Sequence, residues 1–322
     1  MAAVCVLALA FVLLLPLTQS HGDGAPGPAG RGTARGTQTR AGQCDDATAQ
    51  DQSLAPSGAG GQTVAAIEER GYLRVGVDQN SYRWGYLNPN NPSGKLEGFD
   101  IDLAYAIAKD IFGGADYQQK IHFQAIPTDQ RVPAIQNDQV DMVVRTMTIT
   151  CDRLEDVRFS APYFRTGQQV LAPRNSAITG YDGTLAGQRV CTAATSTAYD
   201  KITADRQAGR IPSSTKIVTV PNQLDCLVRL QLGEADAVVT DGALAASQAA
   251  QDPTVELKGT SFTSEYYGVA MKLTAGDLVR RVNRTLEEYR SSGGWKDSYD
   301  KWLSPTLGED SDSANPPEAH YR

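Results

Sequence analysis

Histidine is scarce in this chain of 322 residues, which contains only three. His21 and His320 stand near the ends of the chain, so that only His122 falls within its middle. Catalytic triads and metal sites built on histidine are therefore nearly excluded. We predict no catalytic residue, no metal and no cofactor, and we expect that the protein is not an enzyme.

Basic residues are outnumbered, with 30 Lys and Arg against 37 Asp and Glu, which gives a formal net charge of −7. They also form no cluster along the chain. Because nucleic acids attract proteins through basic patches, an acidic chain without such a patch is a poor candidate for binding them. We expect no nucleic-acid partner.

Long apolar runs are missing except at residues 2–17. This run is too short to be a confident transmembrane helix, and Thr18 and Ser20 behind it provide the small residues of a cleavage site. We therefore predict a signal peptide at residues 1–20 and export to the outer face of the cytoplasmic membrane or the cell wall space. An uncleaved membrane anchor is the alternative. Cys5 stands at the beginning of the run, where a lipoprotein cysteine should follow it, so the sequence leaves lipid anchoring open.

Large aliphatic residues are nearly absent from residues 21–62, where Leu54 is the only Leu, Ile, Val or Phe. Such a segment cannot bury enough apolar surface to offset the entropy lost on ordering. We predict a flexible tether, pinned at one point by Cys44. The last residues, 306–322, are acidic from Glu309 onward and are expected to be loose.

Cysteine is used sparingly, and removal of the signal peptide leaves four: Cys44, Cys151, Cys191 and Cys226. An even number in an exported chain favours disulfides over two pairs of free buried thiols. The spacings match no zinc pattern. Three pairings remain open at this point.

Strands and helices alternate through the rest of the chain. An apolar strand is expected at 72–77, a helix with one apolar face at 99–114 and a buried strand at 141–144. A second series of the same kind follows, with strands at 189–193, 216–220 and 236–241. This order predicts an α/β fold with a largely parallel sheet in each of two halves, and the length suits about two domains.

Polar residues stand where several of these strands end: Asp78, Thr146, Thr148, Arg153, Thr195, Thr197 and Asp241. Arg153 offers a planar fork that suits a carboxylate, and the helix that starts near Thr197 offers free N–H groups. Asp78 and Asp241 can accept an ammonium group. Because open α/β sheets bind ligands beyond the carboxyl ends of their strands, these groups together predict a site for a zwitterion, most simply a free α-amino acid.

Each of these features also has a purely structural interpretation. Threonines are common in strands, Arg153 has Glu155 and Asp156 nearby as surface partners, and Ser, Thr and Asp often cap helices. We favour the binding site because all of the features fall at equivalent strand ends.

Several longer motifs carry a family resemblance: LEGFDIDLAYAIAKDIFG, RVPAIQNDQVDMVVRTMTITCDRLEDVRFSAPYF, LAGQRVCTAATST, ADAVVTD, YYGVAMK and LEEYRSSGGWKDSYDKWL. Through them the sequence resembles the bacterial extracellular solute-binding proteins of the polar amino-acid type (family 3), which serve ABC importers. The likeness spans about residues 64–303 and is strongest toward the glutamine-binding lipoproteins of actinobacteria.

The resemblance implies a two-lobed, periplasmic-binding-protein-like α/β fold of type II. Each lobe would hold a mainly parallel sheet with helices on both faces. Lobe 1 would comprise residues 63–169 and 269–305, and lobe 2 residues 170–268. Two crossing hinge strands are expected at 167–174 and 266–272.

The implied function is the capture of free glutamine, glutamate, asparagine or aspartate between two closing lobes. The protein, expected to be a monomer, would deliver this ligand to the permease of an ABC importer. A sensor that passes ligand occupancy to a membrane signalling partner is the alternative. An enzyme on the same fold is disfavoured by the scarcity of histidine.

The resemblance also assigns the groups that would hold the α-carbon substituents. Thr148 and Arg153 would bind the α-carboxylate, assisted by the backbone at Thr197, with Thr195 beside it. Asp241 would bind the α-ammonium group.

At the ligand side chain, the resemblance places Asp78 facing the ligand, Trp84 closing the pocket and Arg131 where it can meet an acidic side chain. Two positions depart from the family pattern. Thr146 replaces the usual glycine before the Thr-x-Thr, and Ala193 stands where some relatives carry a lysine.

The lobe division also predicts a disulfide pairing. Cys191 and Cys226 both fall in lobe 2, on a strand and a helix that should pack together. Cys151 falls in lobe 1, which leaves Cys44 as its partner.

Overall fold

The computed structural model describes residues 44–322. The expected signal peptide and residues 21–43 of the expected tether lie outside this part of the chain. Within it, no helix combines the length and the apolar character that crossing a membrane requires.

The first five-stranded sheet, which we assign to lobe 1, has the strand order β6-β2-β7-β16-β8. Strands β6, β2 and β7 run parallel, whereas β16 runs antiparallel to both β7 and β8. The strands are β2 (Leu73–Val77), β6 (Ile121–Ala125), β7 (Met142–Val143), β8 (Val157–Phe159) and β16 (Ala270–Lys272).

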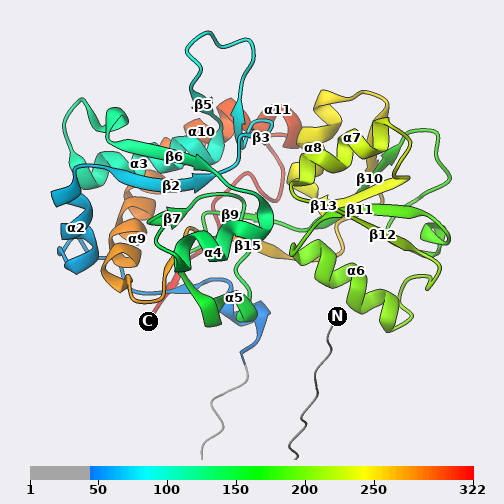
Figure 1. Ribbon diagram of the computed structural model, residues 1–322, viewed down its shortest axis with the longest axis horizontal. Helices are drawn as coiled ribbons and strands as arrows, with labels where there is room; N and C mark the ends of the chain where they lie inside the picture. The colour runs from blue at the N-terminus through cyan, green and yellow to red at the C-terminus, as the bar shows by residue number, and fades with distance from the viewer. Residues whose placement is uncertain (1–43) are drawn as a thin grey trace, which may run out of the picture. The chain divides into compact units, whose positions relative to one another are not determined.

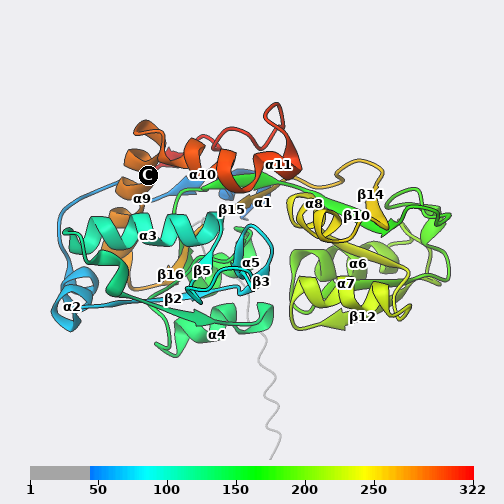
Figure 2. The same cartoon turned by 90° about the horizontal axis from the view of Figure 1, so that it is seen from above.

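Alternate residues at β7 enter cores on opposite faces of this sheet, as the two-residue repeat of a strand requires. Met142 and Val144 belong to the larger core, and Val143 belongs to the smaller one. Helices α3 and α9 lie on one side of β2 and α4 on the other (Figure 2). The helices on the two faces are α2 (Gln62–Arg70), α3 (Phe99–Phe112), α9 (Gly276–Ser291) and α10 (Gly294–Trp302), against α4 (Arg131–Gln136) and α5 (Cys151–Asp156).

The second five-stranded sheet, assigned to lobe 2, has the order β12-β11-β13-β10-β14. Strands β12, β11 and β13 are parallel, and β10 is antiparallel to β13 and β14. Helix α6 packs on one face, while α7 and α8 pack on the other (Figure 1). These elements are β10 (Gln168–Pro173), β11 (Arg189–Ala193), α6 (Thr197–Gln207), β12 (Lys216–Val220), α7 (Gln223–Gln231), β13 (Ala237–Asp241), α8 (Gly242–Gln251) and β14 (Val255–Lys258).

Two chain segments connect the sheets, close to where crossing strands were expected. Strand β9 (Phe164–Thr166) leads into β10, and β15 (Glu265–Tyr267) leads into β16. Strands β9 and β15 pair with each other in antiparallel fashion. The two-lobed α/β fold class is thus confirmed. In each sheet four of the five strands run in the same direction, as expected for a mainly parallel sheet, and the fifth, which comes from a connecting segment, runs antiparallel to both of its neighbours.

Smaller elements complete the described part of the chain. A short antiparallel sheet in lobe 1 has the order β3-β4-β5. Its strands and the remaining helical segments are β3 (Asn80–Ser81), β4 (Gly85–Leu87), β5 (Leu96–Glu97), η1 (Tyr117–Gln119), η2 (Thr128–Gln130), η3 (Gly183–Leu185) and α11 (Ser304–Leu307).

Residues 44–61 and the C-terminal residues differ from the expected tether and loose tail. Helix α1 (Asp46–Ala49) follows Cys44, and β1 (Gln52–Ser53) pairs in parallel with β17 (His320–Tyr321). The Ser53 hydroxyl donates to the Phe159 carbonyl oxygen at 2.9 Å. Backbone pairing and a disulfide hold these segments, and neither depends on the large aliphatic residues that the composition lacks.

Both predicted disulfides are confirmed. Cys191 on β11 bonds to Cys226 on α7, with their Cα atoms 5.5 Å apart. Cys44 bonds to Cys151 at the start of α5, with Cα atoms 5.8 Å apart. The second bond fixes the N-terminal segment two residues from Arg153.

Candidate functional site

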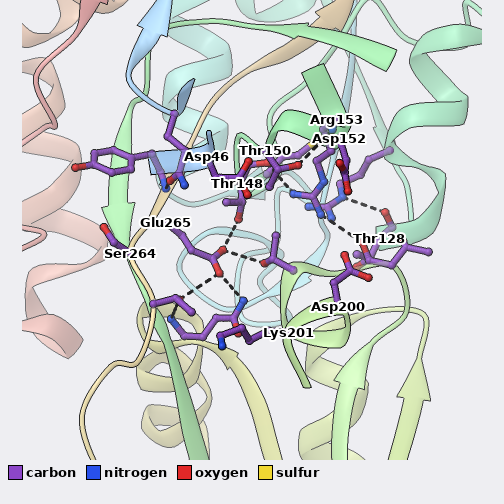
Figure 3. A pocket seen from close by; sticks show the side chains of 18 of the residues that line it. Asp46, Thr128, Thr148, Thr150, Asp152, Arg153, Asp200, Lys201, Ser264 and Glu265 are labelled. Carbon is purple, nitrogen blue, oxygen red and sulfur yellow. Dashed lines mark hydrogen bonds between the residues drawn. The ribbon is translucent and has the colours of Figure 1, made fainter. Parts of the chain in front are cut away.

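A cavity of about 970 Å³ opens between the lobes (Figure 3). We call it the outer cavity. Its walls carry charges of both signs, and they come from both lobes, from β15 and from the N-terminal segment. Its lining includes Asp46, Arg131, Thr148, Arg153, Gln168, Thr195, Thr197, Thr263 and Glu265.

A second cavity of about 30 Å³ shares part of this wall. We call it the deep chamber. Its lining includes six of the predicted site residues, namely Arg131, Thr146, Thr148, Arg153, Thr197 and Asp241. The structure thus brings most of the sequence-predicted site together around one space.

Direct hydrogen bonds join the two lobes beside the deep chamber. The Gln223 side-chain amide donates to Asp78 Oδ2 at 3.1 Å. Arg145 Nη2 donates to Asn222 Oδ1 at 3.0 Å, and Arg153 Nη2 donates to the Thr195 carbonyl oxygen at 3.3 Å. The lobes are in contact in this arrangement, so a ligand of amino-acid size needs them to move apart before it can enter the chamber.

Thr146 adopts a left-handed backbone conformation, with φ of 39°. The resemblance predicts glycine here, and a positive φ explains that preference, since glycine adopts it without steric cost. The Thr146 amide donates to Asp100 Oδ2 at 3.0 Å, and the Tyr163 hydroxyl donates to Asp100 Oδ1 at 2.9 Å. Burial raises the pKa of Asp100 to about 7, against the effect of these two hydrogen bonds. The hydrogen bond from the Thr146 amide to Asp100, which Tyr163 holds in place, offsets the conformational cost of the positive φ at Thr146.

Arg153 directs both terminal nitrogens at backbone carbonyls. Nη1 donates to the Thr148 oxygen at 2.7 Å, and Nη2 reaches Thr195 across the cleft. Burial lowers its pKa, while the fields of Glu265 and the other nearby acids raise it. The expected alternative, a surface ion pair with Glu155 or Asp156, does not occur among the described residues. The guanidinium charge therefore lies in the cleft without a paired carboxylate.

Arg131 is a buried arginine at the cleft, with 5% of its surface exposed. Nε donates to the Thr128 carbonyl oxygen at 3.0 Å, and Nη1 lies 3.4 Å from that of Arg145. Burial, and then the like charge of Arg153, lower its pKa well below the usual value. Within residues 44–322 it forms no ion pair. An anionic ligand group in the chamber would therefore offset the cost of burying the charge of Arg131.

Asp241 lies at the end of β13, buried in the wall of the deep chamber. Its side chain makes no capping hydrogen bond to α8, so the simple role of a helix cap is not observed. Instead its carboxylate accepts a hydrogen bond from the Tyr267 hydroxyl. Burial, and next the negative field of Glu265, raise the pKa of Asp241 to about 8. A cation placed beside it would favour the ionised form.

Three predicted residues lie elsewhere than expected. Asp78 is bound by Arg145 at 2.9 Å and by the Ser81 hydroxyl at 2.8 Å, and it lines neither cavity. Its buried carboxylate is satisfied by a protein cation, so it is not free to receive a ligand amide. Trp84 is fully buried against aromatic neighbours such as Phe164, away from both cavities. Thr195 lines only the outer cavity, where its carbonyl accepts from Arg153.

Sequence reasoning missed Glu265, which is 4% exposed. Its Oε2 accepts hydrogen bonds from the Thr148 hydroxyl at 2.6 Å and the Thr197 hydroxyl at 2.9 Å. Figure 3 shows its side chain pointing toward Thr148. The one signal in the sequence was its position directly before the expected crossing strand at 266–272. Arg145 and Gln223, which also line the chamber, gave no signal of their own.

Comparison with known proteins places this geometry in a family. Residues 73–305 match the model of the bacterial extracellular solute-binding proteins, family 3. The chain is 33% identical over 247 residues to the ABC transporter glutamine-binding protein GlnH of Bacillus subtilis, covering 77% of this chain and 86% of that protein. It is 28% identical over 290 residues to the glutamate-binding protein GluB of Corynebacterium glutamicum, covering 87% and 94% of the two chains.

A solved structure agrees with the fold. The solute receptor for L-cysteine of Neisseria gonorrhoeae superposes with a TM-score of 0.72 at 28% identity, covering 80% of this chain and all of that one. The sequence match spans both lobes and both connecting segments. The chain therefore belongs to the bacterial extracellular solute-binding proteins, family 3.

Proposed function

We propose that this protein binds a free polar L-amino acid between its lobes, outside the cytoplasmic membrane, and delivers it to the permease of an ABC importer. The ligands proposed are glutamine, glutamate, asparagine and aspartate. The relatives that bind glutamine and glutamate support this choice. The protein acts as a binding component without catalytic chemistry, and as a monomer.

Arg153 and Asp241 both line the deep chamber, and their presence in one wall is the main support for the proposal. Arg153 is a half-buried cation without an ion pair among the described residues, and Asp241 is a buried carboxyl group hydrogen-bonded to the neutral Tyr267 hydroxyl. Buried charges are costly unless they are matched. A zwitterion supplies both missing partners, the α-carboxylate for Arg153 and the α-ammonium for Asp241.

The two residues come from different lobes, which connects ligand binding to closure. Arg153 belongs to α5 of lobe 1, and Asp241 ends β13 of lobe 2. A ligand held by both stabilises the arrangement in which the lobes meet, because it binds that arrangement better than one with the lobes apart. The connecting segments with β9 and β15 are the natural place for the required bending.

Arg131 sets the expected preference for the ligand side chain. It lines the deep chamber, whereas Asp78 is held by Arg145 and lines neither cavity. The cation thus acts without the opposing carboxylate that the sequence suggested. We therefore propose that the acidic ligands bind more tightly than the amides.

Calorimetric titration of the purified protein with each common amino acid tests the proposal. We expect saturable binding of the four proposed ligands, recovery of each ligand unchanged, and no binding of lysine or arginine, which Arg131 repels. Uptake of the labelled ligand by cells with and without the protein then tests delivery. Absence of binding by all four would overturn the proposal.

A further inference from the structure

The side chain of Glu265 makes four hydrogen bonds, and its carboxylate is the acceptor in all of them. Oε2 accepts from Thr148 and Thr197, and Oε1 accepts from the Gln168 amide and the Thr263 hydroxyl. The partners come from both lobes and from both connecting segments. No cation lies within ion-pair distance of Glu265 in the described part of the chain. A carboxylate placed in this way fixes the orientation of every donor around it.

A threonine hydroxyl has one proton to donate and two lone pairs that accept. Because Thr148 and Thr197 each give that proton to Glu265, they keep only acceptors for any other contact. Both side chains line the deep chamber. The hydroxyls therefore cannot donate to a ligand carboxylate while these bonds persist.

The same region holds further acceptors. Asp241 lines the deep chamber with Thr148 and Thr197. In the wall of the adjoining outer cavity, Gln168 is 1% exposed, and its Oε1 has no hydrogen-bond partner among the described residues. These acceptors suit a ligand group with several donors, and an ammonium group is the simplest of that kind. The arginines that line the same chamber, Arg131, Arg145 and Arg153, are left for the anionic end of the ligand.

We propose that Glu265 is a positioning residue that makes the Thr148 and Thr197 hydroxyls acceptors for the ligand ammonium group, and so selects α-amino acids over the corresponding α-hydroxy acids. The proposal rests on the proposed function and deepens it. It also reassigns the Thr148 hydroxyl, which the family resemblance gave to the α-carboxylate. That carboxylate is left to Arg153 and to backbone N–H groups.

The test compares each of the four amino acids with its (S)-2-hydroxy analogue, in which a hydroxyl replaces the ammonium group. We expect the wild-type protein to prefer the amino acid by at least about 100-fold, because its buried acceptors are left unmatched by the analogue. In Glu265→Gln the side-chain NH₂ donates, so a threonine hydroxyl is released to donate to the analogue. The preference should then fall at least about tenfold.

Three further variants separate positioning from charge and from fold. Glu234→Gln removes the same charge from an exposed pair with Arg229 and should leave the preference unchanged. Glu265→Asp keeps a carboxylate and should retain most of the preference. In a Thr148→Val/Thr197→Val background, Glu265→Gln should have no further effect on the preference, because the hydroxyls through which Glu265 acts are gone.

The outcomes are distinct. If the wild-type protein binds none of the amino acids, the proposed function fails. If it binds them and Glu265→Gln leaves the preference unchanged, or lowers both affinities equally, the role of Glu265 is overturned and the function stands. An undiminished effect in the double-valine background would show that Glu265 acts by its charge alone, which also overturns the proposal. Thermal melts followed by circular dichroism confirm that each variant is folded.

Discussion

Arg145 and Asp78 form a buried ion pair of 2.9 Å at the ends of two neighbouring strands of lobe 1. The side chains are 1% and 5% exposed. Gln223 of lobe 2 donates to the same Asp78 oxygen. The pair is thus part of the contact between the lobes, at the place where the sequence suggested a direct contact with the ligand.

Asp78→Ala should destabilise the protein far more than it alters ligand selectivity. The substitution leaves Arg145 buried without its counterion, a change that typically costs about 3–5 kcal/mol. Urea denaturation should show a loss of unfolding free energy in this range. Arg174→Ala is the matched control, since it breaks an exposed pair with Glu256 that is worth about 0–1 kcal/mol. A loss for Asp78→Ala no larger than the control would mean that the pair is not a structural element.

Arg153→Ala should abolish amino-acid binding while the protein stays folded. The change removes a forked, charged donor and leaves the ligand carboxylate buried without a partner, at a cost of roughly 2–5 kcal/mol in binding free energy. Arg153→Lys should recover only part of the loss, because an ammonium group lacks the planar fork. Calorimetric titration checks both variants, and Arg174→Ala again serves as the control. Affinity within about threefold of wild type for Arg153→Ala would remove this residue from the site.

The sequence predicted well those features that depend on local pattern. Apolar strands followed by polar residues located Thr148, Arg153 and Asp241, which all line the deep chamber. The pairing of Cys191 with Cys226 followed from a strand and a helix that had to pack together. In each case the information lies within a short stretch of chain or in the order of elements.

Features that depend on which side chains meet could not be predicted in this way. Glu265 reaches Thr148 across 117 positions in the chain, because the second connecting segment passes the carboxyl end of a strand in lobe 1. Asp78 stands at a strand end just as Asp241 does, but a buried arginine binds it. Only the folded arrangement decides which of two such aspartates remains for a ligand.

Arg131→Met should shift selectivity from acids toward amides. Methionine keeps much of the apolar volume and removes the charge that a side-chain carboxylate would meet in the chamber. We expect the glutamate-to-glutamine affinity ratio to fall by about tenfold or more, equivalent to about 1.4 kcal/mol. Competition titrations with the two ligands measure the ratio directly. An unchanged ratio would show that Arg131 does not meet the ligand side chain, although it lines the chamber wall.

Asp241 should couple binding to the release of a proton. Burial raises the pKa of its carboxyl to about 8 in the free protein, so below that pH the group is largely protonated. A ligand ammonium group beside it favours the carboxylate and lowers its pKa in the complex. Binding below about pH 8 therefore releases a proton, and affinity should rise with pH by up to about tenfold per unit before levelling near pH 8. Calorimetry in buffers with different ionisation enthalpies counts the protons released.

Two substitutions test whether Asp241 is the group responsible. Asp241→Asn has no proton to lose, so the residual affinity should vary little between about pH 6 and about pH 8. Tyr267→Phe removes the hydrogen bond that lowers the pKa of Asp241, so the pH at which affinity levels off should move upward. The sign is decisive, because loss of a donor to a carboxylate always disfavours its ionised form. A wild-type affinity that does not change over this range, with no proton released, would mean that the ligand ammonium does not lie against Asp241.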